Sequence, residues 1–173
     1  MNIYLKTKNL LLVPISLDYA EDIFREFTSE ITAYMYPKPY KKIEDTKHSI
    51  QSSITKNNEG SNLQMVVLAP NGSSFLGCAA IHNIDTDIPE FGIWIKRSAQ
   101  GNSYGKEAIF ALKTWADKNL HYKYLLYPVT TDNNASRRIP ESLGGNISRE
   151  YDDTNMSGNL QHILEYRIYP DKK

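Results

Sequence analysis

The stretch of this sequence with the clearest chemical potential is residues 100–108, QGNSYGKEA. Two glycines and several small polar residues lie between an apolar, strand-like run and an apolar, helix-like run. At a helix N-terminus, free main-chain N–H groups and the helix dipole favour an anion, and glycine lets the main chain approach it closely. The stretch is therefore compatible with a phosphate-binding loop, although by itself it does not predict one. The alternative is a polar turn in which Ser103 caps the following helix.

Two common phosphate motifs do not fit this stretch. A Walker loop has four residues between its first glycine and a Gly-Lys pair, which is followed by serine or threonine. Here three residues separate Gly101 from Gly105, and Lys106 is followed by Glu107. A dinucleotide fingerprint needs a third glycine early in a βαβ unit, which is also missing. The loop remains compatible with a pyrophosphate bound by main-chain groups alone.

The elements that position this loop can be read from apolar periodicity and turn residues. The pattern predicts a mixed α+β chain with a loop at residues 33–40, where two prolines and three tyrosines occur. Strands are predicted at residues 10–15, 63–68, 75–81, 90–95, 124–129, 147–151 and 160–168. Helices are predicted within residues 16–27, 42–57, 108–116 and 131–145.

The composition excludes several classes of function. The 173 residues carry 20 basic and 20 acidic side chains, so a net charge of +0 gives no electrostatic case for a nucleic-acid or anionic-membrane partner. No apolar run approaches the ~18 residues of a membrane helix, and the N-terminus lacks a signal-peptide layout. Cys78 is the only cysteine, so no disulfide is expected and no metal site is predicted. We expect a single cytoplasmic domain over residues 1–173.

Residues 90–112, EFGIWIKRSAQGNSYGKEAIFAL, resemble the central motif of the GNAT acetyltransferases. In that family the pattern Gln/Arg-x-x-Gly-x-Gly/Ala follows a strand and opens a helix. Gln100 and Gly105 match its first and last positions, whereas Ser103 stands where glycine is usual. Residues 5–24 look like the family's opening strand and helix, and TTDNNASRRIPESLGG looks like the segment that follows its fifth strand. The chain is most similar to the RimJ/RimL-like branch, which includes ribosomal-protein N-terminal acetyltransferases.

The resemblance implies a fold and a reaction. The fold is a single GNAT-like domain with a central mixed, mostly antiparallel twisted sheet of about seven strands and about four helices. The reaction is direct transfer of acetyl from acetyl-CoA to a primary amine. The amine must lose a proton, the thioester oxygen needs a hydrogen-bond donor, and the departing thiolate benefits from a proton.

The same resemblance implies catalytic residues. Ser136, in NNAS, is expected near the sulfur, since the tyrosine position of other relatives is Pro140 here. The alternative is that Ser136 only caps a helix. Glu90, at the start of EFGIWI, is the expected general base, and the alternative is an ordinary strand-edge carboxylate. His82 and Asp85 at the end of the preceding strand are further candidates to contact the amine.

For the cofactor, the resemblance implies that the main chain of Ile93 and Ile95 pairs with pantetheine as an added strand. The pyrophosphate is expected on Gln100, Gly101, Asn102, Ser103, Tyr104 and Gly105, with Asn133 nearby. Basic residues in this region are expected to be solvated.

The acceptor pocket is expected to come from residues 31–40 and the last hairpin, with Tyr34, Tyr36 and Tyr40 as an aromatic wall. Burial of these tyrosines in the core is the alternative.

The acceptor itself remains open at this point. A protein N-terminus, such as that of a ribosomal protein, and a polyamine or other small amine are both compatible with the sequence. Short acidic segments are scattered along the chain and do not decide between them. The alternative from another class is a catalytically silent CoA-binding domain used for sensing or assembly. The chain is expected to act as a monomer or homodimer.

Overall fold

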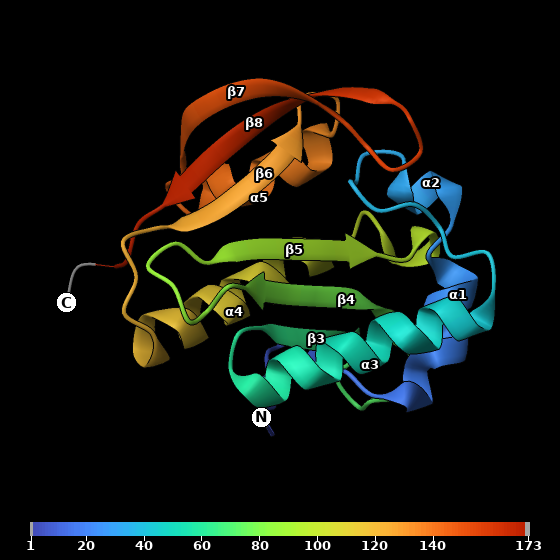
Figure 1. The fold of residues 1–173 in the computed structure, drawn as a ribbon. Coiled ribbons are helices and arrows are strands. Elements are labelled where there is room, and N and C mark those ends of the chain that lie inside the picture. The colour runs from blue at the N-terminus through green and yellow to red at the C-terminus, as the bar shows by residue number, and fades with distance from the viewer. Residues whose placement is uncertain (1, 172–173) are drawn as a thin grey trace.

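The computed structural model describes residues 2–171, and Figure 1 labels its elements. The strands are β1 (Leu5–Lys6), β2 (Leu11–Pro14), β3 (Leu63–Leu68), β4 (Phe75–His82), β5 (Glu90–Ile95), β6 (Leu125–Thr130), β7 (Asn146–Thr154) and β8 (Leu160–Ile168). The helices are α1 (Ala20–Glu26), α2 (Ser29–Thr32), α3 (Ile43–Glu59), α4 (Tyr104–Asn119) and α5 (Asn134–Ser142), with short 3-10 helices η1 (Leu17–Tyr19) and η2 (Arg97–Ala99). No helix in the described range is long and apolar enough to span a membrane.

The strands form one sheet in the order β1-β2-β3-β4-β5-β6-β8-β7. Neighbouring strands are antiparallel except for β5 and β6, which run parallel. The mixed, mostly antiparallel α+β architecture expected from the sequence is therefore confirmed. The structure adds β1 and α2, which have two and four residues and are too short to produce a periodic pattern.

The parallel pair divides the sheet. β5 and β6 pair only where Glu90 lies opposite Leu126, whereas β4 and β5 pair continuously from His82–Glu90 to Gly77–Ile95. The two parallel strands consequently separate towards their C-terminal ends, as Figure 1 shows. Beyond that single pair, no strand of the described residues pairs with the edge of β5 that faces β6.

Helices pack on both faces of the N-terminal half of the sheet. In β3, Val66 belongs to the core beneath α1 and α3, whereas the adjacent Met65 and Val67 belong to the core beneath α4. Figure 1 shows α3 in front of β3 and β4, with α4 behind them. The apolar stripe expected on the latter helix is buried, at Ala108, Ile109, Leu112 and Ala116.

The longest helix, α3, is fixed to the sheet at its C-terminal end. It ends at Gly60, which adopts a left-handed conformation with a φ of 78°. Asn57 donates Nδ2–H to the carbonyl of Gln64 at 2.9 Å and accepts the Gln64 N–H at 2.8 Å. This pair of hydrogen bonds fixes the orientation of α3 about its axis. Thr46 and Ile50 on the same helix are buried.

Candidate active site

A cleft of about 500 Å³ opens where β5 and β6 separate, and we call it the splay cleft. Its walls are the C-terminal half of β5, the loop of residues 99–106 and the beginning of α5. The residues expected to bind cofactor or act in catalysis that line this cleft are Ile93, Ile95, Gln100, Gly101, Ser103, Tyr104, Gly105, Asn133 and Ser136.

The loop before α4 presents main-chain donors to the cleft. Among the described residues, no protein acceptor binds the N–H groups of residues 101–106, whereas the Glu107 N–H bonds to the Ser103 carbonyl at 3.0 Å. These free donors stand at the start of a 16-residue helix, where the helix dipole adds partial positive charge. The loop can therefore bind a pyrophosphate without a lysine.

Two side chains hold the shape of this loop. Gln100 donates Nε2–H to the Ile95 carbonyl at 3.0 Å, and its Oε1 accepts a bond from Arg97 at 3.1 Å. Asn102 donates Nδ2–H to the Ala99 carbonyl at 3.1 Å. The side chain of Asn102 thus bonds to its own loop, and this residue does not line the splay cleft.

Ser103 occupies the N-cap position of α4 without capping it. Its φ of 61° and ψ of 14° are left-handed, and its side chain makes no capping hydrogen bond. This conformation costs a residue with a Cβ atom about 1–2 kcal/mol, which glycine avoids. The left-handed main-chain conformation explains why glycine is usual at this position in the family. The alternative in which the Ser103 side chain caps the helix is wrong, because that side chain makes no capping hydrogen bond.

Replacing Ser103 with glycine is expected to stabilise the protein by about 0.5–1 kcal/mol, because the strain is removed. Tm should rise by about 1–4 °C, and the affinity for coenzyme A should be unchanged or higher. Thermal unfolding and calorimetric titration measure the two effects. Ser98→Gly, in η2, is the matched control and should lower Tm. A large loss of affinity in Ser103→Gly would show that the hydroxyl itself binds the cofactor.

The free edge of β5 supplies further main-chain groups. The Lys96 N–H bonds to the Leu76 carbonyl of β4 at 2.8 Å. Successive residues of a strand point their N–H and carbonyl groups to opposite neighbours, so those of Ile93 and Ile95 point away from β4. That side is the splay cleft. Because the Ile95 carbonyl already accepts Gln100, the unbonded groups suited to an extended ligand are the N–H and carbonyl of Ile93 and the Ile95 N–H.

Ser136 lies in the first turn of α5, which Asn133 caps by accepting the Ser136 N–H at 3.1 Å. Its Oγ is 2.8 Å from the hydroxyl of Tyr127, a β6 residue that is 2% exposed. Burial raises the pKa of Tyr127 to about 12, partly offset by the bond to Ser136. A protonated phenol that donates to Ser136 leaves the serine proton free to point into the cleft.

Lys106 and Arg138 line the splay cleft, and both are exposed. Lys106 lies in the first turn of α4 and Arg138 is the fifth residue of α5, so both add positive charge to the cleft that holds the free N–H groups. Arg137 bonds instead to the Thr131 carbonyl at 3.3 Å. For Lys106 the sequence signal was its position just after a helix N-terminus.

A second pocket of about 310 Å³ lies on the face of β4 and β5 that α1 and α3 cover, and we call it the α3 pocket. The two hollows share Met35, Ile93 and Trp94 in their linings. They therefore meet at the free edge of β5. Molecules bound in each can approach one another there.

The loop of residues 33–40 contributes to the α3 pocket through one of the three expected tyrosines, Tyr40, and through two further residues. Met35, Pro37 and Tyr40 line the pocket, whereas Tyr34 is 48% exposed and Tyr36 is 61% exposed. Neither of the exposed tyrosines lines either hollow. An irregular loop has no fixed side-chain period, so its inward residues could not be read from the sequence.

His82 does line the α3 pocket, where it is half-buried. Its Nδ1 is 3.1 Å from Nδ2 of Asn62. Burial lowers the pKa of His82, and the nearby charge of Lys56 lowers it further. Asp85 is exposed and lines neither hollow.

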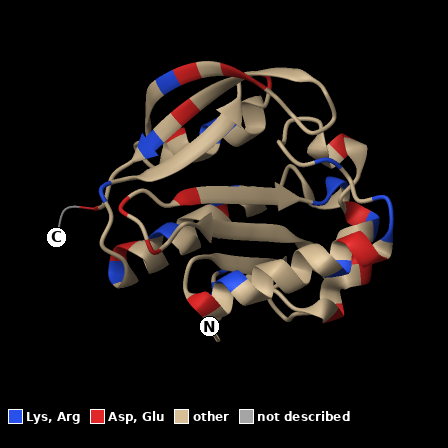
Figure 2. Ribbon diagram, in the orientation of Figure 1, with Lys and Arg blue, Asp and Glu red and all other residues tan. Residues whose placement is uncertain are grey.

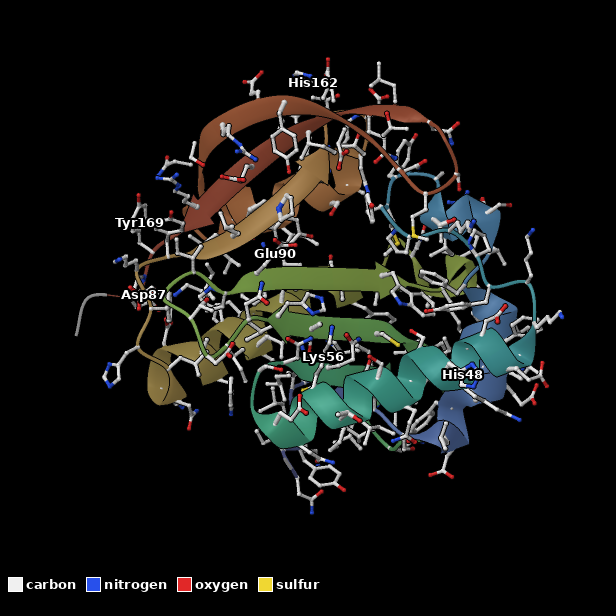
Figure 3. The ribbon with its side chains drawn as sticks, viewed as in Figure 1. His48, Lys56, Asp87, Glu90, His162 and Tyr169 are labelled. Atoms are coloured by element: carbon white, nitrogen blue, oxygen red, sulfur yellow. The ribbon has the colours of Figure 1, made fainter. Side chains whose placement is uncertain are left out.

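Glu90 lies at the beginning of β5, where that strand pairs with Leu126 of β6 (Figure 3). It is half-buried and lines neither hollow, although its side chain shares a sheet face with Gly92. Burial raises the pKa of Glu90, and the negative charge of Glu165 on β8 raises it further.

Within residues 2–171, no group of three or more His, Cys, Asp and Glu side chains could hold a metal ion.

Two hydrogen bonds to main-chain carbonyls join the 33–40 loop to the turn between β7 and β8. The carbonyl of Met35 accepts Asn155 Nδ2–H at 3.3 Å, and the carbonyl of Tyr36 accepts the Met156 N–H at 2.9 Å. The 33–40 loop and the last hairpin therefore meet.

Comparison with protein families gives a match to the acetyltransferase (GNAT) domain over residues 9–146. No curated protein sequence matches the chain. Among solved structures, a RimL ribosomal L7/L12 α-N-protein acetyltransferase in complex with coenzyme A superimposes with a TM-score of 0.88 at 14% identity. The alignment covers 99% of this chain and 100% of that chain.

Two further structures have the same fold. A Salmonella typhimurium acetyltransferase described as modifying the N-terminal serine of L7/L12 gives a TM-score of 0.82 at 15% identity, over 95% of this chain and 97% of that one. The microcin C7 self-immunity acetyltransferase MccE, with acetyl-CoA and AMP, gives 0.83 at 17% identity, over 94% and 93%. Because the family match spans most of the sequence, the chain belongs to the GNAT acetyltransferases, and its fold is that of RimL, as expected for the RimJ/RimL-like branch.

Proposed function

We propose that the chain moves an acetyl group from acetyl-CoA, held in the splay cleft, to a primary amine that enters through the α3 pocket. The observation that carries this proposal is the junction of the two hollows at Met35, Ile93 and Trp94. The cofactor supplies the acetyl group as a thioester. The residues suited to hold it are the free N–H groups of residues 101–106, with Lys106 and Arg138 for its phosphates.

The chemistry of the α3 pocket favours one of the two acceptor classes. Its lining contains no Asp, Glu, Lys or Arg side chain. Figure 2 shows that β3, β4 and β5 are uncharged apart from Glu90. A polyamine would bury several ammonium groups without a carboxylate, at a high desolvation cost. The pocket therefore suits an acceptor with one reacting amine on an uncharged body, such as a protein N-terminus. The RimL proteins are described as acting on such an N-terminus.

The amine must be deprotonated in this site. An apolar junction lowers the pKa of an ammonium group by desolvation, and Glu90 is the nearest charged residue of the strand that both hollows share. A carboxyl group with a raised pKa is matched to accept that proton near neutral pH.

Glu90→Gln is expected to lower kcat/KM about 10- to 100-fold at neutral pH if Glu90 is the base. In the wild type, kcat/KM should fall as the pH drops through the raised pKa of Glu90, because the carboxylate is then protonated. This acidic limb should be missing from the variant's pH–rate profile. Glu44→Gln, at an exposed position of α3, is the control. An unchanged rate and profile in Glu90→Gln would assign deprotonation to another group.

The proposed reaction is tested by thermal shift with acetyl-CoA, followed by release of free thiol in the presence of an amine panel. The panel contains a dipeptide amide, an alkylamine and spermidine. We expect a stabilising shift and thiol release with the dipeptide amide above all. Binding without release for any amine would support the CoA-binding sensor instead, and spermidine as the best acceptor would contradict the assignment of an uncharged acceptor.

A further inference from the structure

Thr46 lines the α3 pocket, and its buried hydroxyl has no hydrogen-bond partner among residues 2–171. It lies on α3 with 0% of its surface exposed, and it lines the pocket. Its Oγ1 makes no hydrogen bond to any described residue. Buried polar atoms in native proteins almost always have a hydrogen-bond partner. We therefore expect a molecule bound in the pocket to supply the partner of this hydroxyl.

His82, on the opposite wall, is fixed in one tautomer by Asn62. The Oδ1 atom of Asn62 accepts the Asn83 N–H at 3.1 Å, and only an oxygen can do so. The other amide atom of Asn62 is then Nδ2, which donates to His82 Nδ1 at 3.1 Å. Since Nδ1 accepts, the ring proton of neutral His82 is on Nε2.

The Nε2 atom is held against the strand that both hollows share. A Cβ atom at Gly92 would lie 3.0 Å from Nε2, so only glycine leaves the ring this close to β5. The charged groups around the ring are Lys56 on α3, labelled in Figure 3, and Glu90, its cross-strand partner on β5. The ring thus presents Nε2–H, and not a basic lone pair, to the pocket.

We infer that Thr46 and His82 bind uncharged oxygen atoms of the acceptor, next to its reacting amine. An N–H donor and a hydroxyl in a pocket without charged side chains fit the carbonyl or hydroxyl oxygens of an N-terminal peptide residue, which a simple alkylamine lacks. This inference rests on the proposed function and names the feature by which the acceptor is selected. Asn62 acts through His82 as a positioning residue.

Kinetics with seryl-alanine amide and n-butylamine test the inference. The wild type should prefer the dipeptide amide by about 100-fold in kcat/KM, because the amine without oxygens leaves both polar groups unpaired. Thr46→Val should lower this preference about tenfold and also raise Tm, since it removes an unsatisfied buried hydroxyl without changing its shape. Thr46→Ser should restore the preference. Thr55→Val, at an exposed position of the same helix, is the matched control for both readouts.

The tautomer is tested with Asn62→Asp. A carboxylate can accept both the Asn83 N–H and a proton on His82 Nδ1, so it raises the pKa of His82 and leaves neutral Nε2 without hydrogen. In this variant, kcat/KM for the dipeptide amide should fall about tenfold as the pH rises through that raised pKa. The wild type should show no such fall, and His82→Leu should show low activity at every pH.

The outcomes distinguish failure of this inference from failure of the proposed acetyltransferase function. Loss of preference in Thr46→Val and His82→Leu, with the pH dependence in Asn62→Asp, would support it. Wild-type turnover with equal kcat/KM for the two acceptors, or variants that slow both acceptors equally, would overturn it while the acetyltransferase activity stands. No thiol release with any amine in the wild type would refute the proposed function itself.

Discussion

Replacing Gly105 with aspartate is expected to raise the dissociation constant for coenzyme A more than about 100-fold while the protein stays folded. Gly105 lines the splay cleft one residue after the start of α4. A carboxylate about 5 Å from a phosphate repels it by about 3 kcal/mol at an effective dielectric constant of about 20. The same carboxylate is favourable to the helix, whose N-terminal dipole attracts negative charge.

The space around Gly105 supports the expectation that the fold survives. A Cβ atom there would meet Ile139 Cδ1 at 3.4 Å and the side chains of Ile93 and Ile95 at 3.8 Å, without touching the main chain. Gly105→Ala should therefore weaken binding only a few-fold. Phe110→Asp adds the same charge to α4 at a position that is 59% exposed, and should leave binding unchanged.

Calorimetric titration with coenzyme A measures these effects, and circular dichroism checks the fold. If folded Gly105→Asp binds coenzyme A as well as the wild type does, the phosphates are held elsewhere and the role assigned to the loop is wrong. If Phe110→Asp loses as much affinity as Gly105→Asp, the effect comes from net charge and not from the cleft.

The sequence was informative where the signal is local. A strand, a glycine-containing loop and a helix start are contiguous, so residues 100–105 could be placed at a helix N-terminus, whereas the expectation for Ile93 and Ile95 rested on the family resemblance. The conformation of Ser103 could not be predicted from the local sequence. Its type suggested a cap, but its left-handed conformation depends on how the loop joins η2 to α4.

Features that depend on tertiary packing could not be read in the same way. The bond between Tyr127 and Ser136 requires that β6 and α5 lie against each other, and nothing in the spacing of the two residues indicates it. Thr46 gave a weaker signal that was missed. It falls three residues after Ile43 and four before Ile50, within an apolar stripe, where a polar residue marks a buried site that needs a partner.

Replacing Ser136 with alanine is expected to lower kcat by about 100-fold or more, with little change in acetyl-CoA affinity. The Tyr127 hydroxyl is 2.8 Å from Ser136 Oγ, and when the phenol donates, the serine proton is left for the splay cleft, where a departing thiolate needs a hydrogen bond. Serine is a weak acid, and its contribution is to place that proton more than to give it up. Tyr127→Phe should lower kcat about tenfold, because Ser136 then loses its orientation.

The two variants must be separated from simple loss of stability. Ser136→Ala leaves a buried phenol unpaired, at a cost of about 1–3 kcal/mol, and should lower Tm. The double variant removes both partners, so Tm should recover while kcat remains low, and the double-mutant cycle should show strong coupling. Ser142→Ala, whose hydroxyl bonds to the Ile139 carbonyl at 2.8 Å away from the cleft, is the control on the same helix. If folded Ser136→Ala keeps the wild-type kcat, Ser136 has no catalytic role and only packs at the α5 N-terminus. A loss confined to the KM for acetyl-CoA would make it a binding residue with no part in the departure of the thiolate.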